Sequence, residues 1–357
     1  MIYLHVPFCR SFCTYCDFYS EIACRERDAQ DFEAYTDAVC AEISRRREEI
    51  EATRGTNTLY IGGGTPSVLP PSCLERIVSR LGGAPFAEFT VEVNPEDIVE
   101  KGGGYVRRLL ALGAGRISMG VQSLDDGILR WMNRRHDAAG ARQAFRILRE
   151  AGVRNISVDL IFGLSQLTQE TFAATLTELL AWRPEHISAY QLGIEEGSTL
   201  GAWTREGRYT EASQEQCAAQ YRQLCTALRE AGYLHYEISN WALPGREAVH
   251  NSAYWTRQPY AGLGPGAHSF DGAVRAWNGE HPAGWSRAGS ERLSPEEIRE
   301  ETILLGLRTA RGVPASLPDP TQARKLLENG RLERVGDRLR IPEAAWFVSD
   351  DIIAELI

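Results

Sequence analysis

Short apolar segments alternate with amphipathic segments through residues 1–192, and this alternation restricts the possible folds more than any other feature of the chain. The predicted strands cover residues 1–6, 58–61, 89–93, 116–121, 156–162 and 186–192. The predicted helices cover residues 31–50, 72–81, 105–112, 125–132, 137–151 and 169–182, the second with Ser72 and Glu75 as a capping box. Strands that alternate with helices at a spacing of about thirty residues form a parallel sheet with helices outside it. The pattern therefore predicts an α/β fold, a partial, TIM-like (β/α)6 barrel.

The composition changes after residue 192, which indicates further parts of the fold. Residues 195–209 are polar and predict a loop, and residues 211–231 predict a helix. Near the end of the chain, a helix around residues 302–311 is followed within residues 321–357 by a helix, a short strand pair and a helix. We therefore expect a partial barrel over residues 1–240, a connecting segment over 241–295 and a C-terminal α+β, winged-helix-like domain over 296–357.

Length, composition and charge limit the classes of protein that remain. The chain has 357 residues, enough for such a barrel with an appended domain. Hydrophobic residues make up 43% and charged residues 24%, as in globular proteins with a large core. The formal net charge of −9 argues against a nucleic acid partner. No apolar stretch is long enough to cross a bilayer and no signal peptide precedes the first strand, so we expect a cytoplasmic protein without a transmembrane segment.

Three cysteines, Cys9, Cys13 and Cys16, lie in one short loop directly after the first strand. Three thiolates can bind three irons of a cubic iron–sulfur cluster, which normally takes four cysteines. The position two after Cys16 is Phe18, so one iron would lack a protein ligand and could bind a small molecule. Taken alone, the loop is also compatible with a zinc site completed by His5, with a redox pair or with buried small side chains.

The five other cysteines have no spacing that indicates a ligand set. They are Cys24, Cys40, Cys73, Cys217 and Cys225. In a reducing compartment such residues are most simply buried thiols, and we assign them no function.

The cysteine loop resembles the signature of radical S-adenosylmethionine (radical SAM) enzymes, Cys-x-x-x-Cys-x-x-Cys with Tyr15 before the last cysteine. The longer string from Tyr3 through Cys9 to Phe18 is similar to that of the oxygen-independent coproporphyrinogen III oxidases and their haem-chaperone relatives. This resemblance spans nearly the whole chain. It implies a barrel of the radical SAM type and a [4Fe-4S] cluster on the three cysteines. It also implies that S-adenosylmethionine (SAM) binds the open iron through its amino and carboxylate groups, with Tyr15 near the adenine.

Active sites of such sheets lie at the carboxyl ends of the strands, where most of the remaining candidates are found. Gly63, Gly64 and Thr65 follow the second strand, although a plain tight turn would need glycines as well. The resemblance implies that this turn contacts the methionine part of SAM. Glu92 ends the third strand, and by the same resemblance it binds the cofactor.

Further candidates lie on the later strands and loops. Arg134 stands beside a second arginine and would by itself be taken as solvated, but the resemblance implies that its planar donor fork pairs with a ligand carboxylate. Asp159 lies in an otherwise apolar strand, where a charge needs a partner. Ser165 and Leu167 depart from the family, which usually has proline and glutamine there, so the contacts of that loop are left open. The residues that we assign to cofactor binding are Tyr3, Tyr15, Gly63, Gly64, Thr65, Glu92, Gln122, Arg134, Asp159, Gln191 and His250.

One string beyond the barrel strands combines histidine, tyrosine and tryptophan, namely His250-Asn251-x-x-Tyr254-Trp255. A single histidine in such a segment is more often a packed residue than a ligand. The string resembles the hallmark of the haem-chaperone branch, which implies haem as a further cofactor. Neutral imidazole is a common axial haem ligand, and aromatic rings can cover a porphyrin face. His250 is therefore the candidate axial ligand, and His268, in a glycine-rich loop, is its rival.

The resemblance leaves three hypotheses for function. The first is a haem chaperone that binds a [4Fe-4S] cluster, SAM and haem and passes haem to acceptor proteins, with an electron donor such as flavodoxin or ferredoxin if the cluster is reduced. The second is an oxygen-independent coproporphyrinogen III dehydrogenase, and the third is a zinc-stabilised binding protein. Phe18 favours the first, because the dehydrogenases carry a fourth cysteine at that place and lack the histidine-containing string. No residue is assigned a catalytic role.

Overall fold

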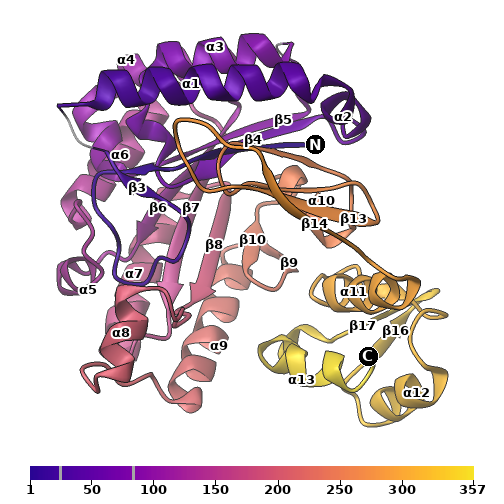
Figure 1. The fold of residues 1–357 in the computed structure, drawn as a ribbon. Coiled ribbons are helices and arrows are strands. Elements are labelled where there is room, and N and C mark those ends of the chain that lie inside the picture. The colour runs from indigo at the N-terminus through magenta and orange to yellow at the C-terminus, as the bar shows by residue number, and fades with distance from the viewer. Residues whose placement is uncertain (24–25, 83–84) are drawn as a thin grey trace.

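The computed structural model describes residues 1–23, 26–82 and 85–357, and a nine-stranded sheet forms its centre (Figure 1). The strands, in spatial order, are β11 (Ala261–Leu263), β1 (Ile2–Val6), β4 (Thr58–Gly63), β5 (Glu88–Val93), β6 (Arg116–Gln122), β7 (Ile156–Phe162), β8 (His186–Gln191), β10 (Asn240–Ala242) and β9 (Leu234–Glu237). Cys24, one of the unassigned cysteines, lies outside the described residues.

Six strands of this sheet, β1 and β4 to β8, pair in parallel and in chain order, which confirms the predicted partial barrel. Their residues are mainly apolar and buried, as expected for parallel strands that are covered on both faces. β11 extends the sheet in parallel beside β1, with Ala261 opposite Ile2. β10 pairs antiparallel with β8 at the other edge. Part of the predicted connecting segment, residues 241–295, is therefore an edge of the main sheet.

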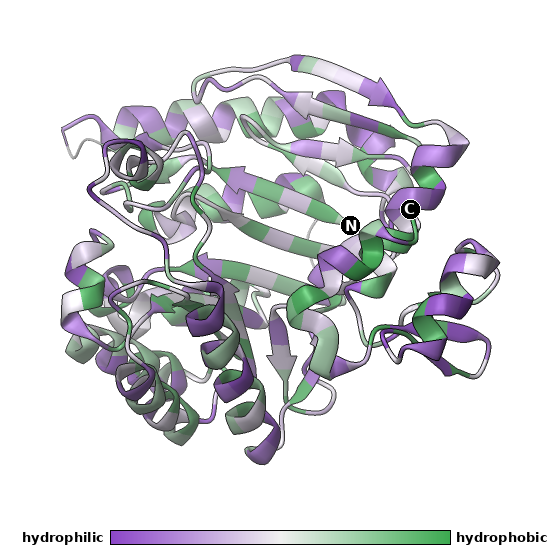
Figure 2. Cartoon of the chain, turned by 90° about the horizontal axis from the view of Figure 1, so that it is seen from below, coloured by the Kyte–Doolittle hydropathy of each residue, from purple (hydrophilic) through white to green (hydrophobic). Residues whose placement is uncertain are grey.

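Helices cover the sheet on its outside, with α1, α3 and α4 together on one side of it in Figure 1. The helices of this part are α1 (Asp28–Arg45), α2 (Arg47–Ala52), α3 (Pro71–Leu81), α4 (Pro95–Leu112), α5 (Asp126–Trp131), α6 (Ala138–Ala151), α7 (Gln169–Trp182), α8 (Thr199–Arg205), α9 (Gln214–Glu230) and α10 (Val249–Trp255). Hydrophobic and hydrophilic residues alternate along them (Figure 2), because one face of each packs inward.

Several local predictions are wrong. The helix predicted around residues 302–311 instead covers Pro295–Leu307, and the one predicted over residues 31–50 is two helices, α1 and α2. No side chain caps α3, which instead begins with a proline at its first turn, and Glu75 pairs with Arg108 at 2.8 Å. The predicted polar loop over residues 195–209 contains helix α8, because the Ser198 hydroxyl accepts a hydrogen bond from the Gly201 N–H at 3.0 Å. Helix α4 begins ten residues before the predicted start at residue 105, and Gly102 (φ 66°) interrupts it.

The last part of the chain is a small α+β unit, as the sequence predicts. Its elements are α11 (Pro295–Leu307), β15 (Val313–Pro314), α12 (Pro320–Glu328), β16 (Glu333–Val335), β17 (Arg338–Arg340), the 3-10 helix η2 (Glu343–Val348) and α13 (Ser349–Ala354). Backbone hydrogen bonds join it to the barrel, from Ile238 N to Arg308 O (2.9 Å) and from Ala310 N to Tyr236 O (3.0 Å). A second small sheet, β12 (His268–Phe270), β13 (Val274–Asn278) and β14 (Arg287–Arg292), precedes it.

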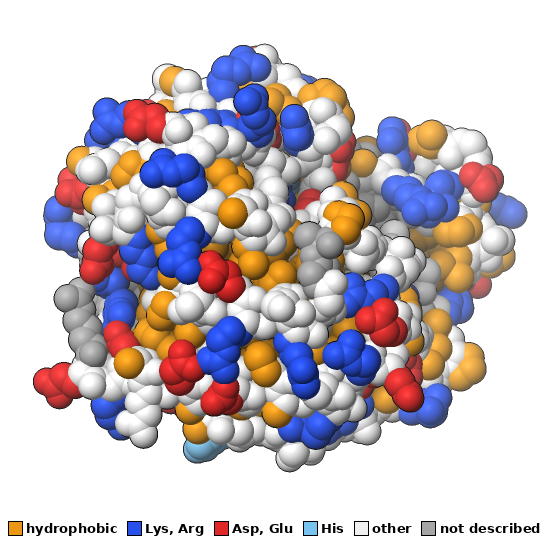
Figure 3. All heavy atoms as spheres, turned by 90° about the horizontal axis from the view of Figure 1, so that it is seen from above, with side chains coloured by type: hydrophobic (Ala, Val, Ile, Leu, Met, Phe, Trp, Pro, Cys, Tyr) orange, Lys and Arg blue, Asp and Glu red, His pale blue; other side chains and the backbone are white. Residues whose placement is uncertain are grey.

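The surface carries charges of both signs. On the face in Figure 3, which looks down on the side of α1 and α3, Lys and Arg lie interspersed with Asp and Glu. Within the described residues, none of the helices combines the length and the apolar character that crossing a membrane requires.

Candidate functional site

A cavity of about 680 Å³ opens at the carboxyl ends of the parallel strands. Most of the predicted site residues line it, although they come from seven separate segments of the chain. The predicted residues that line it are Cys9, Cys13, Tyr15, Cys16, Gly63, Gly64, Thr65, Glu92, Gln122, Arg134, Asp159 and Gln191. The barrel pattern alone explains this convergence, because the ends of parallel strands meet at one edge of the sheet.

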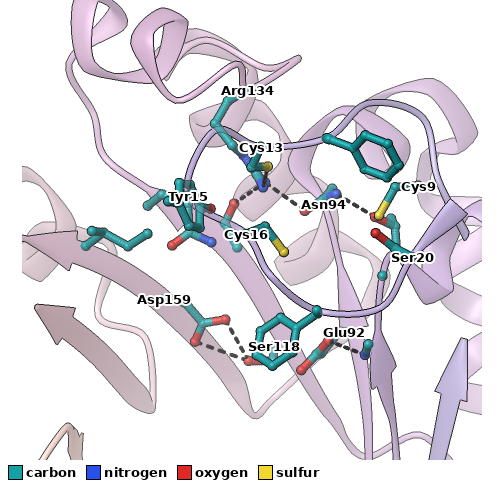
Figure 4. A pocket seen from close by; sticks show the side chains of 18 of the residues that line it. Cys9, Cys13, Tyr15, Cys16, Ser20, Glu92, Asn94, Ser118, Arg134 and Asp159 are labelled. Atoms are coloured by element: carbon teal, nitrogen blue, oxygen red, sulfur yellow. Dashed lines mark hydrogen bonds between the residues drawn. The ribbon is translucent and has the colours of Figure 1, made fainter. Parts of the chain in front are cut away.

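The three loop cysteines reach the cavity from one side, and their sulfur atoms lie around a common space (Figure 4). Cys9 ends the short strand β2 (Phe8–Cys9), which pairs with β3 (Glu21–Ile22) and so closes the loop on itself. The loop is also held from outside, since the Thr14 N–H donates to Met132 O at 3.1 Å. The backbone therefore fixes the directions of the thiols.

The arrangement of these thiols differs from a zinc site. Sulfur ligands of one zinc ion, each about 2.3 Å from the metal, lie about 4 Å apart in a tetrahedron. In the described part of the chain, only one set of three His, Cys, Asp or Glu residues has its ligand atoms within 4.8 Å of one another, and the loop cysteines do not belong to it. The three loop sulfurs are therefore more widely spread than the ligands of one zinc ion. His5, the predicted fourth zinc ligand, donates from Nε2 to Tyr19 O at 2.8 Å and accepts at Nδ1 from the Tyr3 hydroxyl at 3.1 Å. Both of its nitrogens are thus engaged away from the cysteines.

Arg134 joins the cysteine loop to the ends of the strands (Figure 4). Its Nη1 donates to Cys13 Sγ at 3.4 Å, and its Nη2 donates to Asn94 Oδ1 at 2.7 Å and to Gly120 O at 2.8 Å. Burial opposes its charge, but the neighbouring Tyr15 and Cys13 side chains raise the pKa of Arg134. Its Nε is buried without a hydrogen-bond partner among the described residues. The guanidinium group of Arg134 lines the cavity, where its positive charge can attract an anionic group.

Two carboxyl groups face the cavity from the sheet. Glu92 accepts hydrogen bonds from the Tyr60 hydroxyl (2.6 Å) and the Gly63 N–H (3.1 Å), and burial raises its pKa to about 7. Asp159 accepts from the Ser118 hydroxyl at 3.3 Å to each oxygen, and burial raises its pKa as well. This is the partner that the sequence required for a charge in an apolar strand.

The glycine turn after β4 owes its composition to close packing. A Cβ on Gly63 would lie 2.5 Å from the His5 ring, and its φ is +111°. A Cβ on Gly64 would lie 2.9 Å from Phe8 O and 3.1 Å from Cys9 Sγ. The turn therefore presses against the cysteine loop, and no larger residue fits there.

Two predicted site residues lie outside the cavity lining. Tyr3 does not line the cavity, and its hydroxyl forms a hydrogen bond with His5. His250 is 1% exposed, its Nδ1 is 2.8 Å from Thr58 Oγ1 and its Nε2 is 3.0 Å from the Tyr254 hydroxyl. The rival, His268, is exposed, and its ring stacks with Trp277 at 6.0 Å between centroids.

Sequence reasoning also missed residues that line the cavity. Asn94 accepts a hydrogen bond from Arg134 and donates one from Nδ2 to Thr65 Oγ1 at 3.1 Å. Its place just beyond the third strand, two residues after Glu92, is a signal that could have identified it. Asn251, the second residue of the histidine-containing string, lines the cavity where His250 does not.

Comparisons with known proteins agree with this geometry. Residues 3–179 match the model of the radical SAM superfamily. The parallel sheet, the three-cysteine loop and this match place the chain in the radical SAM superfamily, and the superfamily implies a [4Fe-4S] cluster and SAM. Proteins named "Heme chaperone HemW" are similar over nearly the whole chain. The one from Synechocystis sp. is 36% identical over 94% of this chain and 84% of its own length, and the one from Mycobacterium tuberculosis is 30% identical over 100% and 94%. Within the superfamily, the chain belongs to the HemW family.

A solved structure supports the fold. The coproporphyrinogen III oxidase HemN from Escherichia coli superposes with a TM-score of 0.79 over 99% of this chain and 89% of that chain. Its sequence is 21% identical, so this likeness concerns the fold alone.

The residues present fit the two groups that the superfamily implies. Three sulfur donors share one space, which suits a cluster bound by three cysteines. The guanidinium group of Arg134 and the carboxyl groups of Glu92 and Asp159 line the cavity and offer charge of both signs to a ligand such as SAM.

Proposed function

We propose that this chain is a haem chaperone, which binds a [4Fe-4S] cluster, SAM and haem and delivers haem to acceptor proteins in the cytoplasm. The observation that carries the proposal is the identity of 30–36%, over 94–100% of the chain, to proteins named as haem chaperones. Phe18, 73% exposed, supports it, because a fourth cysteine is absent from the place where the coproporphyrinogen dehydrogenases carry one.

We assign a part to each group of residues that lines the cavity. Cys9, Cys13 and Cys16 hold the cluster, which supplies an iron with an open coordination position when it is bound. Arg134 attracts the carboxylate end of SAM, and Glu92, once ionised, attracts its amino group. If the cluster is reduced, an electron donor such as flavodoxin or ferredoxin would have to approach this loop, where Phe12 is 49% exposed.

Two histidines are candidates to hold the haem, His250 and His268. Ligation by His250 requires that the side chain leave its bonds to Thr58 and Tyr254 and reach solvent or the cavity. His268 is already exposed beside Trp277, an aromatic surface of the kind that porphyrins contact.

Haem titration of the anaerobically reconstituted chain tests this proposal. We expect a Soret band that survives gel filtration and that weakens in the ligand variant, His250→Ala or His268→Ala. Because His250→Ala also removes packing, free imidazole is added as a rescue: it restores the spectrum of a lost ligand but not that of a lost packing contact. A chain that retains no haem through gel filtration would refute haem binding.

Two assays separate the remaining functions. Conversion of coproporphyrinogen III to protoporphyrinogen IX by the same preparation would favour the dehydrogenase instead. For delivery, the haem-loaded chain is mixed with a panel of apo-haem proteins. A transfer rate that rises with acceptor concentration indicates direct delivery, whereas a rate independent of concentration throughout the panel is simple haem loss and contradicts it.

A further inference from the structure

Outside the cavity, Cys225, His235 and Glu343 bring a sulfur, an imidazole nitrogen and a carboxylate oxygen within 4.8 Å of one another. They come from α9, β9 and the start of η2, so the group spans the barrel and the C-terminal α+β unit. Cys225 is buried, the His235 side chain is 4% exposed and that of Glu343 is 38% exposed. No other set of three such residues is as close in the described part of the chain.

The surroundings hold the imidazole of His235 in the orientation that a ligand needs. Its ring stacks with Trp241 at 4.0 Å between centroids and meets Trp346 edge-on at 4.2 Å. Its Nε2 faces Ile238 O at 3.4 Å, and its Nδ1 faces Glu343 Oε1 at 3.1 Å. A metal-bound histidine usually donates its outer N–H to a carbonyl or carboxylate in this way, which leaves the other nitrogen for the metal. Arg229, 3.7 Å from Glu343 Oε2, contacts the carboxylate oxygen that is turned away from the ring.

We propose that Cys225, His235 and Glu343 bind a zinc ion that fastens the C-terminal α+β unit to the barrel. A thiolate, an imidazole and a carboxylate are ligands that zinc accepts together. Zinc ligands at about 2.0–2.3 Å from the metal lie about 3–4 Å from one another. The three ligand atoms here lie within 4.8 Å of one another, so small side-chain shifts would bring them to these distances. Glu343 is partly exposed, so water can complete the coordination of a bound ion. Because the three ligands come from α9, β9 and η2, the ion would join the C-terminal unit to the barrel.

Cobalt(II) titration of the full chain, with its cluster reconstituted beforehand so that the loop cysteines are occupied, tests the site. We expect about one cobalt per chain, with the sulfur-to-cobalt charge-transfer band of a thiolate ligand. Cys225→Ala should abolish this band, whereas Cys217→Ala, a buried cysteine on the same helix, should keep it. Glu343→Gln, at a partly exposed position, should weaken binding by more than about tenfold, because loss of even an outer-shell partner of a metal site costs about 10–100-fold. A band that survives Cys225→Ala, or no cobalt bound beyond the cluster, overturns the proposal.

A second measurement separates a metal site from an ordinary histidine–glutamate contact. Zinc that binds only the folded chain must raise the unfolding temperature as its concentration rises. We expect this rise in the parent chain and in Cys217→Ala, and its loss in Cys225→Ala and Glu343→Gln. An equal response in all four chains would contradict a zinc clamp at these residues.

Discussion

The carboxyl group of Glu92 should lose its proton near neutral pH, and Glu92→Gln makes this visible in the stability of the cluster-free chain. Burial raises the pKa of Glu92 from 4.5 to about 7, while the bonds from Tyr60 and Gly63 act in the opposite direction. The folded chain therefore holds this proton more tightly than the unfolded chain does. The stability that results is fully present below pH 4.5 and decreases as the pH rises to about 7.

The magnitude follows from that pKa. A rise from 4.5 to about 7 corresponds to about 3 kcal/mol, most of which falls between pH 5 and pH 8. Glutamine does not ionise, so Glu92→Gln should gain about 2–3 kcal/mol relative to the parent chain over this interval. The hydrogen bonds that glutamine cannot reproduce add an offset that does not vary with pH, and the difference between the two pH values removes it.

Urea unfolding under reducing conditions at pH 5 and pH 8 measures both chains, with Glu75→Gln as a surface control for the loss of one carboxylate. A relative gain below about 0.5 kcal/mol would refute the reasoning, because ionised Glu92 would then be as well solvated in the cavity as in the unfolded chain. The same experiment has a functional consequence. If the carboxylate attracts the amino group of SAM, SAM affinity of the reconstituted chain should rise between pH 6 and pH 8, and Glu92→Gln should remove that rise.

Two further changes test the packing of the site. Arg134→Met leaves two part-buried acceptors, Asn94 Oδ1 and Gly120 O, without the Arg134 donor, at about 1 kcal/mol each. Anaerobic reconstitution should therefore retain less iron per chain than in Arg135→Met. Equal iron in the two variants would contradict the role of Arg134. Gly63→Ala should lower the urea unfolding free energy by more than about 1 kcal/mol, because its Cβ would meet the His5 ring at φ +111°; Gly104→Ala, where no atom lies within 4 Å, is the control expected to be neutral or stabilising.

The sequence predicted the barrel well because period and spacing determine it. The six central strands differ from their predicted bounds by two residues at most, since continuous apolar runs between helices leave little choice of pairing. The edges were not predictable in the same way. β11 has three residues, Ala261, Gly262 and Leu263, too few to show a pattern of apolar residues. It is defined only by its backbone hydrogen bonds to β1 and its surroundings, such as the one from Ala261 N to Met1 O.

The site was predicted unevenly for a related reason. Residues at strand ends reach the cavity through the backbone topology alone, so their place on the strand located them. Arg134 follows a short helix, and only the resemblance distinguished it from Arg135 beside it. His250 and Asn251 are neighbours in the sequence but differ in position. His250 contacts Thr58 outside the cavity lining, whereas Asn251 lines the cavity. Successive side chains on a helix point about 100° apart, and the sequence alone does not show which of them faces the cavity.

The charges of the cavity are arranged before any ligand arrives, and this decides which way a ligand can bind. Figure 4 places Arg134 beside Cys13 on the cysteine side, while Glu92 and Asp159 lie on the sheet side. Each is held by fixed bonds, Arg134 by two acceptors and each carboxyl group by a hydroxyl, so no large side-chain reorganisation is needed on binding. A ligand with a carboxylate and cationic groups is therefore favoured in one orientation, with its carboxylate toward the cysteines. Exchange of Arg134 for a neutral residue should weaken this orientation even where the cluster itself still assembles.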